Sequence, residues 1–157
     1  IYVTILSALV FSACEKSKTG GCIDPLAINY ERWADVDDGS CLYEADVVFH
    51  MDYNAAAFLN DEPYVLELEY WVDDVYVGKD VYDFFDVATN TPPYCHEAGF
   101  TTGTIQWNTP NDITISFEAI DNLGAIQWYG AALLSPNECV NIPLEYSHNL
   151  TKDLSNN

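Results

Sequence analysis

The sequence contains few basic side chains and a large excess of acidic ones. Its 157 residues include 5 Lys and Arg against 25 Asp and Glu, which gives a formal net charge of −20 at pH 7. Binding to nucleic acid requires clustered Lys and Arg, and docking on anionic lipid requires basic segments. The composition therefore argues against a nucleic-acid partner and against electrostatic attachment to a membrane. Hydrophobic residues make up 49% of the chain, which is enough for a folded core.

The chain also lacks a recognisable catalytic motif. It contains no G-x-S-x-G, no H-E-x-x-H and no glycine-rich phosphate loop. Its histidines, His50, His96 and His148, are far apart in the sequence, and we expect solvated or hydrogen-bonded surface residues. Because 25 carboxylates always allow some pair to be imagined, their abundance is no sign of a glycosidase. The sequence predicts a non-catalytic protein, with a small hydrolase as the third alternative.

Residues 1–13 (IYVTILSALVFSA) form an uncharged, apolar segment. The segment is shorter than the roughly 20 residues that a membrane-spanning helix needs, and it predicts the remnant of an export signal. Phe11-Ser12-Ala13-Cys14 resembles the lipobox of bacterial lipoproteins. The resemblance implies that Cys14 carries the lipid and that residues 14–20 are a tether. The alternative is a buried N-terminal strand with a free thiol.

The remaining cysteines are even in number: Cys22, Cys41, Cys95 and Cys139. In an oxidising compartment, an even set predicts disulfides rather than free thiols. Four cysteines allow three pairings, and proximity favours Cys22–Cys41 and Cys95–Cys139. The competing interpretation is a zinc site, but the chain has no C-x-x-C and no clustered Cys and His spacing.

Residues 21–43 form a compact block with a specific pattern. The block begins Gly21-Cys22-Ile23-Asp24-Pro25, continues through Asn29-Tyr30 and ends Asp37-Asp38-Gly39-Ser40-Cys41-Leu42-Tyr43. It resembles the GC-x-DP-x-A-x-NY…DDGSC-x-Y module of exported and cell-surface proteins of the phylum Bacteroidota. The segment from Pro93 to Cys139 resembles small uncharacterised lipoproteins of the same phylum. These resemblances imply an exported lipoprotein in which a disulfide-closed module precedes the main domain.

Several carboxylates lie close together in this block. Asp35, Asp37 and Asp38 surround a turn at Gly39, and Asp24 could complete a ligand shell. Calcium prefers hard oxygen ligands, so a structural calcium ion is the one cofactor that the pattern suggests. The spacing is not that of an EF-hand, because Gly39 comes one position early and the distal acidic ligand is missing. The alternative is a set of Asx turns, in which the Asp side chains accept hydrogen bonds from backbone N–H groups.

The hydrophobic period is two across residues 46–147. In residues 64–72, for example, apolar side chains alternate with mainly charged ones. The pattern predicts about seven strands separated by turns, which is typical of an all-β, immunoglobulin-like antiparallel β-sandwich. Residues 54–60 are the only ones expected to be helical, and residues 148–157 are expected to form a disordered tail.

Two hairpins follow from the turn residues in this region. Asp73-Asp74 separates residues 64–72 from residues 75–77, and Asn108–Asp112 separates residues 104–107 from residues 113–119. The same alternation places His50 on the outward side of the first strand of the sandwich.

Three tryptophans fall in predicted strands. Trp107 and Trp128 are expected to pack in the core or between the sheets, as is usual for a sandwich. Trp71 shares the parity of Glu67 and Glu69, which places it toward solvent. Because exposed aromatic rings beside carboxylates and amides are typical of sandwiches that bind sugars, Trp71 is the candidate ligand-binding residue. A core position is the alternative.

Together these features predict a non-catalytic, lipid-anchored protein of the bacterial cell envelope. The lipid on Cys14 would hold it at the outer membrane, on the cell surface or on the periplasmic face. A net charge of −20 repels anionic envelope polymers, so the expected partners are a neutral glycan or another envelope protein. Glycan binding and a structural or assembly role are the two leading hypotheses.

Overall fold

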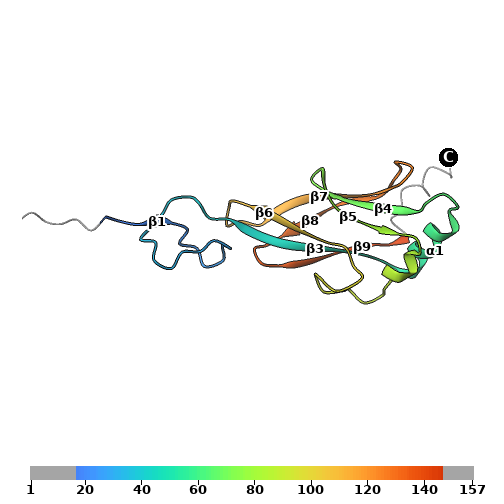
Figure 1. Cartoon of the computed structure of the whole chain (residues 1–157), viewed down its shortest axis with the longest axis horizontal. Helices are drawn as coiled ribbons and strands as arrows, with labels where there is room; N and C mark the ends of the chain where they lie inside the picture. Colours follow the sequence, from blue (N-terminus) through green and yellow to red (C-terminus); the bar gives the residue numbers. More distant parts are fainter. Residues whose placement is uncertain (1–16, 147–157) are drawn as a thin grey trace, which may run out of the picture.

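The computed structural model describes residues 17–146, which form a small N-terminal module followed by a β-sandwich (Figure 1). The predicted signal remnant 1–13, Cys14, His148 and the predicted tail 148–157 lie outside the described residues. The module contains two short parallel strands, β1 (Gly20–Gly21) and β2 (Val36–Asp37). The sandwich strands are β3 (Tyr43–Met51), β4 (Glu67–Val72), β5 (Val75–Val81), β6 (Thr102–Trp107), β7 (Ile113–Asp121), β8 (Ile126–Leu134) and β9 (Cys139–Leu144).

The seven sandwich strands form two sheets, which confirms the predicted all-β sandwich. One sheet has four antiparallel strands in the order β5-β4-β7-β8. The other has three, in the order β6-β3-β9, and its β3–β9 pair is parallel. The first, fourth and seventh strands of the sandwich thus share a sheet, whereas a constant-type immunoglobulin domain groups its third, sixth and seventh strands. The likeness to immunoglobulins lies in the layers rather than in the strand order.

The core lies between the two sheets and follows the predicted alternation. Leu68, Tyr70 and Val72 of β4 all point inward and are buried. Phe49 of β3 crosses from the opposite sheet and stacks on Tyr70, with ring centroids 4.4 Å apart. Trp128 is also buried, as predicted, and its indole N–H donates to the Glu145 carbonyl at 2.9 Å. Each large side chain buried in this way stabilises the fold by roughly 1.5–3 kcal/mol.

One buried carboxylate lies at the edge of this core. Asp80 of β5 accepts hydrogen bonds from the hydroxyls of Tyr70 and Thr101, so it is buried with partners. Burial raises its pKa, although both hydrogen bonds act in the opposite direction. A carboxylate in this position ties β5 to the start of β6 and to the core.

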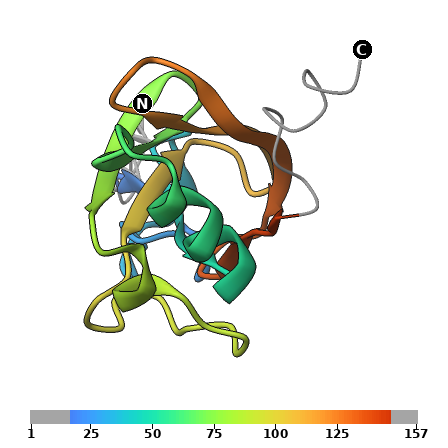
Figure 2. The ribbon, with the colours of Figure 1, turned by 90° about the vertical axis from the view of Figure 1, so that its right-hand side faces the viewer.

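Helix α1 (Tyr53–Asp61) closes one end of the sandwich, where residues 54–60 were predicted to be helical (Figure 2). Asp52 caps the helix, because its Oδ1 accepts the N–H of Ala55 at 2.6 Å. The helix buries Ala55 and Leu59, and it ends just before Pro63. A single 3₁₀ turn, η1 (Phe84–Val87), packs beside it. Within residues 17–146 no helix is both long enough and apolar enough to cross a membrane.

One predicted hairpin is confirmed and the other is wrong. Asp73 and Asp74 join β4 to β5 in a two-residue turn with φ values of 46° and 63°, which Asp tolerates better than most residues. The expected hairpin between residues 104 and 119 does not form, because β6 pairs with β3 while β7 pairs with β4 and β8. Residues 108–112 cross from one sheet to the other. Both kinds of connection use the same turn residues, so local sequence does not distinguish them.

The outer face of the three-stranded sheet is covered, which corrects the prediction for His50. Val48 and His50 point away from the core, yet His50 is only 7% exposed. The segment 88–101 lies over them: Thr89 donates its N–H to the Met51 carbonyl, and the Cys95–Cys139 disulfide fixes the segment to β9. Alternation correctly gives the side of the strand, but a covering segment decides whether that side is solvated.

Candidate functional site

The outer face of the four-stranded sheet carries a row of side chains that crosses all four strands. Trp71 of β4 lies opposite Tyr76 of β5 on one side and opposite Glu118 of β7 on the other. Glu118 in turn lies opposite Tyr129 of β8. Directly opposite residues in a sheet lie close enough for their side chains to interact. The sheet therefore aligns three aromatic rings and one carboxylate in a single line.

The rings of this row are open to solvent to different degrees. Tyr76 is 46% exposed and Tyr129 is 64% exposed, whereas Trp71 is partly buried between its neighbours. The Trp71 and Tyr76 rings meet edge to face, with centroids 5.5 Å apart and an interplanar angle of 68°. Edge-to-face packing against Tyr76 restricts the rotation of the Trp71 side chain, so its ring keeps a defined orientation on the face of the sheet.

Polar groups surround Trp71 on this face. A hollow of about 220 Å³ beside its ring is lined by Asp74, Glu118 and Ile120. The turn that supplies Asp74 is held to β7, because Asp73 Oδ1 accepts hydrogen bonds from the backbone N–H and the hydroxyl of Ser116 at 2.7 and 2.9 Å. The hollow is shallow, and its carboxylates are acceptors for hydroxyl groups.

A basic side chain on this face is already paired with a carboxylate. Lys79 of β5 forms an ion pair with Glu67 of β4, and that hydrogen bond raises the pKa of the Lys79 ammonium group. Glu69, directly opposite Lys79, and Glu118 add negative charge nearby. The face is therefore acidic, and it disfavours anionic ligands while leaving neutral ones unaffected.

The sequence analysis identified Trp71 but not the other three residues of the row, which are Tyr76, Glu118 and Tyr129. The two-residue turn at Asp73-Asp74 pairs Val72 with Val75 and so places Trp71 opposite Tyr76, which the turn length alone could have indicated. Glu118 and Tyr129 could not be found this way. Their alignment depends on the pairing of β4 with β7, strands that are distant in the sequence, and on a register shift in the β7–β8 pair.

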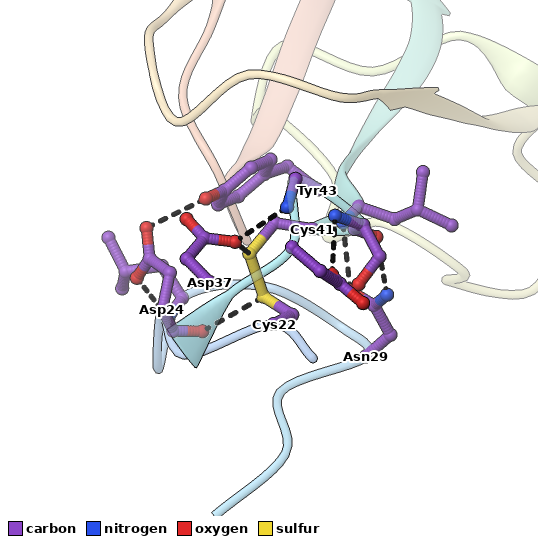
Figure 3. The surroundings of a disulfide bond; sticks show 11 residues. Cys22, Asp24, Asn29, Asp37, Cys41 and Tyr43 are labelled. Atoms are coloured by element: carbon purple, nitrogen blue, oxygen red, sulfur yellow. Dashed lines mark hydrogen bonds between the residues drawn. A yellow bond between two sulfur atoms is a disulfide. The ribbon is translucent and has the colours of Figure 1, made fainter. Parts of the chain in front are cut away.

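The N-terminal module is held by the predicted Cys22–Cys41 disulfide (Figure 3). Its small core consists of Cys22, Ala27, Cys41 and Tyr43, so the disulfide supplies half of the buried side chains. Asn29 adds a polar clamp, because its Oδ1 accepts the N–H of Leu42 and its Nδ2 donates to the Ser40 carbonyl. The second predicted disulfide, Cys95–Cys139, is also present.

Three of the four proposed calcium ligands cap turns within the module. Asp24 accepts the N–H of Leu26 at 2.9 Å and the Tyr43 hydroxyl at 2.7 Å (Figure 3). Asp37 accepts the N–H of Gly39, and Asp38 accepts the N–H of Ser40. These are the Asx turns of the alternative interpretation.

The electrostatics of the module agree with this use of its carboxylates. The hydrogen bond from Leu26, and then that from Tyr43, lower the pKa of Asp24, while burial raises the pKa of Tyr43 to about 12. Asp35, the fourth proposed ligand, donates its backbone N–H to the Thr19 carbonyl at 2.8 Å. In the part of the chain that the structure describes, no three His, Cys, Asp or Glu side chains are grouped to hold a metal, and calcium binding stays a prediction.

The histidines do not form a common site. His96 lies in the segment 88–101, where its Nε2 contacts Asp46 Oδ2 at 2.8 Å. Thr104 donates to the other oxygen of the same carboxylate. His50 lies under the covering segment. We therefore find no catalytic arrangement of histidines within residues 17–146.

The two remaining strand tryptophans have structural positions. Trp128 lies in the core, and Trp107 packs where the module meets the sandwich, with its ring stacked on Tyr43 at 6.4 Å. Asn137 adds a hydrogen bond across the same junction, from its Nδ2 to the Leu26 carbonyl at 2.9 Å. These contacts leave Trp71 as the strand tryptophan on an outer face.

Comparison with known proteins adds no assignment. No protein-family model matches the chain, and no curated protein has a significantly similar sequence.

Proposed function

We propose that this protein is a non-catalytic binding protein of the bacterial cell envelope, and that the outer face of its four-stranded sheet binds a neutral glycan. The observation that carries the proposal is the aligned row of Tyr76, Trp71, Glu118 and Tyr129. Aromatic rings spaced across the strands offer apolar surface to the sugar rings of an extended chain, and Glu118 can accept hydrogen bonds from their hydroxyls.

Charge favours a neutral ligand over an acidic one. The whole chain has a formal net charge of −20, and the row itself lies among carboxylates. The net charge of the chain and the carboxylates beside the row would both repel an anionic polymer, whereas neither would repel a neutral oligosaccharide. The shallowness of the hollow suits an extended chain lying across the strands rather than a small molecule enclosed in a cleft.

The proposed location in the cell envelope rests on the cysteines of the chain. Two disulfides are typical of proteins that fold in an oxidising compartment. The lipobox-like Phe11-Ser12-Ala13-Cys14 supports a lipid on Cys14, which would anchor the protein at the outer membrane of a bacterium of the Bacteroidota type. The module would then lie between the anchor and the glycan-binding sandwich.

The experiment is retention of the protein on an array of immobilised neutral oligosaccharides. Wild type is compared with Trp71→Ala and Tyr129→Ala, and Trp33→Ala serves as the matched control because Trp33 is 76% exposed in the module, away from the row. We expect Trp71→Ala to abolish retention, Tyr129→Ala to weaken it and Trp33→Ala to leave it unchanged. Retention that survives loss of Trp71, or that depends on Trp33, contradicts the proposal.

A second candidate function is assembly with another envelope protein, and the surface of the module favours it. Seven large apolar side chains of the module are exposed: Ile23, Leu26, Ile28, Tyr30, Trp33, Val36 and Leu42. Where such side chains adjoin one another, they form the kind of apolar patch that marks a protein contact surface. In this case Trp33→Ala would abolish crosslinking to a neighbouring envelope protein in intact cells, while Trp71→Ala would not.

A further inference from the structure

A second cavity lies on the other side of the molecule, at the covered outer face of the three-stranded sheet. It has a volume of about 450 Å³ and is formed by the end of β3, by β9 with the residues after it, and by the segment 89–92. This volume falls within the range of small-molecule sites. From the chemistry of its lining we propose that it binds an organic cation, a primary ammonium or guanidinium group on a short alkyl stem.

Two polar atoms at this cavity are buried without hydrogen-bond partners. They are the Nδ1 of His50 and the Oδ1 of Asn141, on neighbouring strands of the sheet. Both residues line the cavity, and His50 is more than nine-tenths buried. Buried polar atoms without partners are rare in folded proteins, because each costs about 1–3 kcal/mol of desolvation. A ligand that supplies hydrogen-bond donors would offset part of that cost.

The carboxylates of the cavity determine the charge of its ligand. Asp52 uses Oδ1 to cap α1, which leaves its second oxygen for another donor, and Glu145 also lines the cavity. No Lys or Arg from residues 17–146 lines the cavity. Burial lowers the pKa of His50, which favours the neutral form of its ring. A cation with several N–H donors therefore matches the lining, and an anion does not.

The remaining lining residues fit the rest of such a ligand. Pro92 and Pro143 provide apolar walls for a hydrocarbon stem. The segment that carries Pro92 has a defined shape, because the Thr89 hydroxyl both accepts the N–H of Thr91 and donates to its carbonyl. A metal ion fits less well, since calcium requires six to eight oxygen ligands and the described residues contain no suitable group.

The test is a calorimetric titration of the full chain with agmatine, which carries both cationic groups, and with uncharged 1,4-butanediol. Asp52→Asn keeps an N-cap and Glu145→Gln keeps its size, so each removes one charge and leaves the fold intact. Glu69→Gln removes one charge on the other sheet and is the matched control. We expect saturable 1:1 binding of agmatine, weakened about tenfold by either cavity variant and unchanged by the control, because a hydrogen bond to a charged group contributes about that much.

The possible results separate the proposal from its alternatives. Absence of saturable agmatine binding, equal binding of 1,4-butanediol, or an equal effect of Glu69→Gln overturns it. Nα-acetyl-arginine amide distinguishes the source of the cation: it binds as tightly as agmatine if a polypeptide side chain is the ligand, and more weakly if the ligand is a free amine. Trp71→Ala is expected to bind agmatine normally, so this site and the glycan site succeed or fail independently.

Discussion

The two sheets of the sandwich share one core but have different outer faces. The four-stranded sheet leaves Tyr76 and Tyr129 open to solvent, with the partly buried Trp71 in line with them across the strands. On the three-stranded sheet, by contrast, Val48 and His50 are buried on the side away from the core. The same alternating strands thus produce an aromatic row on one outer face and a partly covered cavity on the other.

The difference arises from a single segment of the chain. Residues 88–101 have no regular strand or helix, and contacts along their length hold them against β3 and β9. These contacts include the Thr89–Met51 hydrogen bond, the Cys95–Cys139 disulfide, the His96–Asp46 pair and the hydrogen bond from Phe49 to Thr101. A long irregular segment in a compact domain needs such fastening, and here it converts a sheet face into the wall of a cavity. The open face suits an extended ligand, and the covered face suits a small one.

The strongest test of this contrast places a new charge on each outer face. Val48→Asp buries a carboxylate at a position that is 0% exposed, whereas Leu133→Asp places one on β8 at a position that is 58% exposed. We expect Val48→Asp to lower the free energy of unfolding by more than about 4 kcal/mol, and Leu133→Asp to change it by about 0.5 kcal/mol or less. Urea denaturation of both variants measures this, and similar losses would mean that the two faces are equally open.

Removal of the fastening disulfide is expected to have the next largest effect. The Cys95–Cys139 bond closes a loop with a sequence separation of 44, and chain entropy gives it about 4 kcal/mol of stabilisation. Cys95→Ser with Cys139→Ser is expected to lower stability by up to that amount, to open the cavity and to abolish agmatine binding. The Cys22→Ser and Cys41→Ser pair is the control, because it unfolds the module and leaves the covered face in place. Unchanged amide exchange in residues 88–101 after loss of Cys95–Cys139 would count against the account of the covered face.

A smaller effect concerns pH. Burial lowers the pKa of His50 from its ordinary value of 6.5, an effect that Glu145 partly opposes. As pH falls below 6.5, the unfolded chain takes up a proton at this position before the folded chain does, so the native state loses stability until the lowered pKa is passed. His50→Gln is expected to reduce the loss of stability between pH 7 and pH 5, measured by urea denaturation at both values. An identical pH profile in the variant would show that His50 titrates as an exposed side chain.

The smallest expected effect is at the exposed end of the covering segment. His96 contacts Asp46 from a position with a φ of 62°, a conformation that Asn also tolerates. His96→Asn removes the pair without straining the backbone, and because the pair is exposed we expect a loss of less than about 1 kcal/mol. Faster amide exchange confined to residues 95–102 would be its signature. A loss as large as that from the disulfide would place the main fastening at His96 instead.

The sequence was sufficient for features that depend on local pattern. Alternation gave the seven strands and the inward side of Leu68, Tyr70 and Val72, and the Asp52 cap lies at the start of the expected helix. Proximity gave both disulfides. The hairpin at Asp73-Asp74 was also predictable, since two residues can join antiparallel strands in few ways.

Features that depend on distant pairing were not predictable. The turn at residues 108–112 resembles a hairpin turn, but β6 and β7 belong to different sheets. His50 has the parity of an outer residue, and only the position of residues 88–101 shows that it is buried. Trp71 was identified alone, because the alignment of Glu118 and Tyr129 with it requires the register of four strands. Sequence pattern assigns a side chain to a face, and tertiary structure decides what that face contains.

The most direct measurement of the proposed binding face is a titration followed by NMR. A neutral oligosaccharide retained on the array is added to ¹⁵N-labelled protein, and the indole N–H resonances of Trp71, Trp33 and Trp128 are compared. The open-face proposal predicts that Trp71 and the amides of Tyr76, Glu118 and Tyr129 shift together in a saturable way, while Trp33 and Trp128 do not. Shifts centred on the module or on the covered face, with Trp71 unchanged, would contradict it.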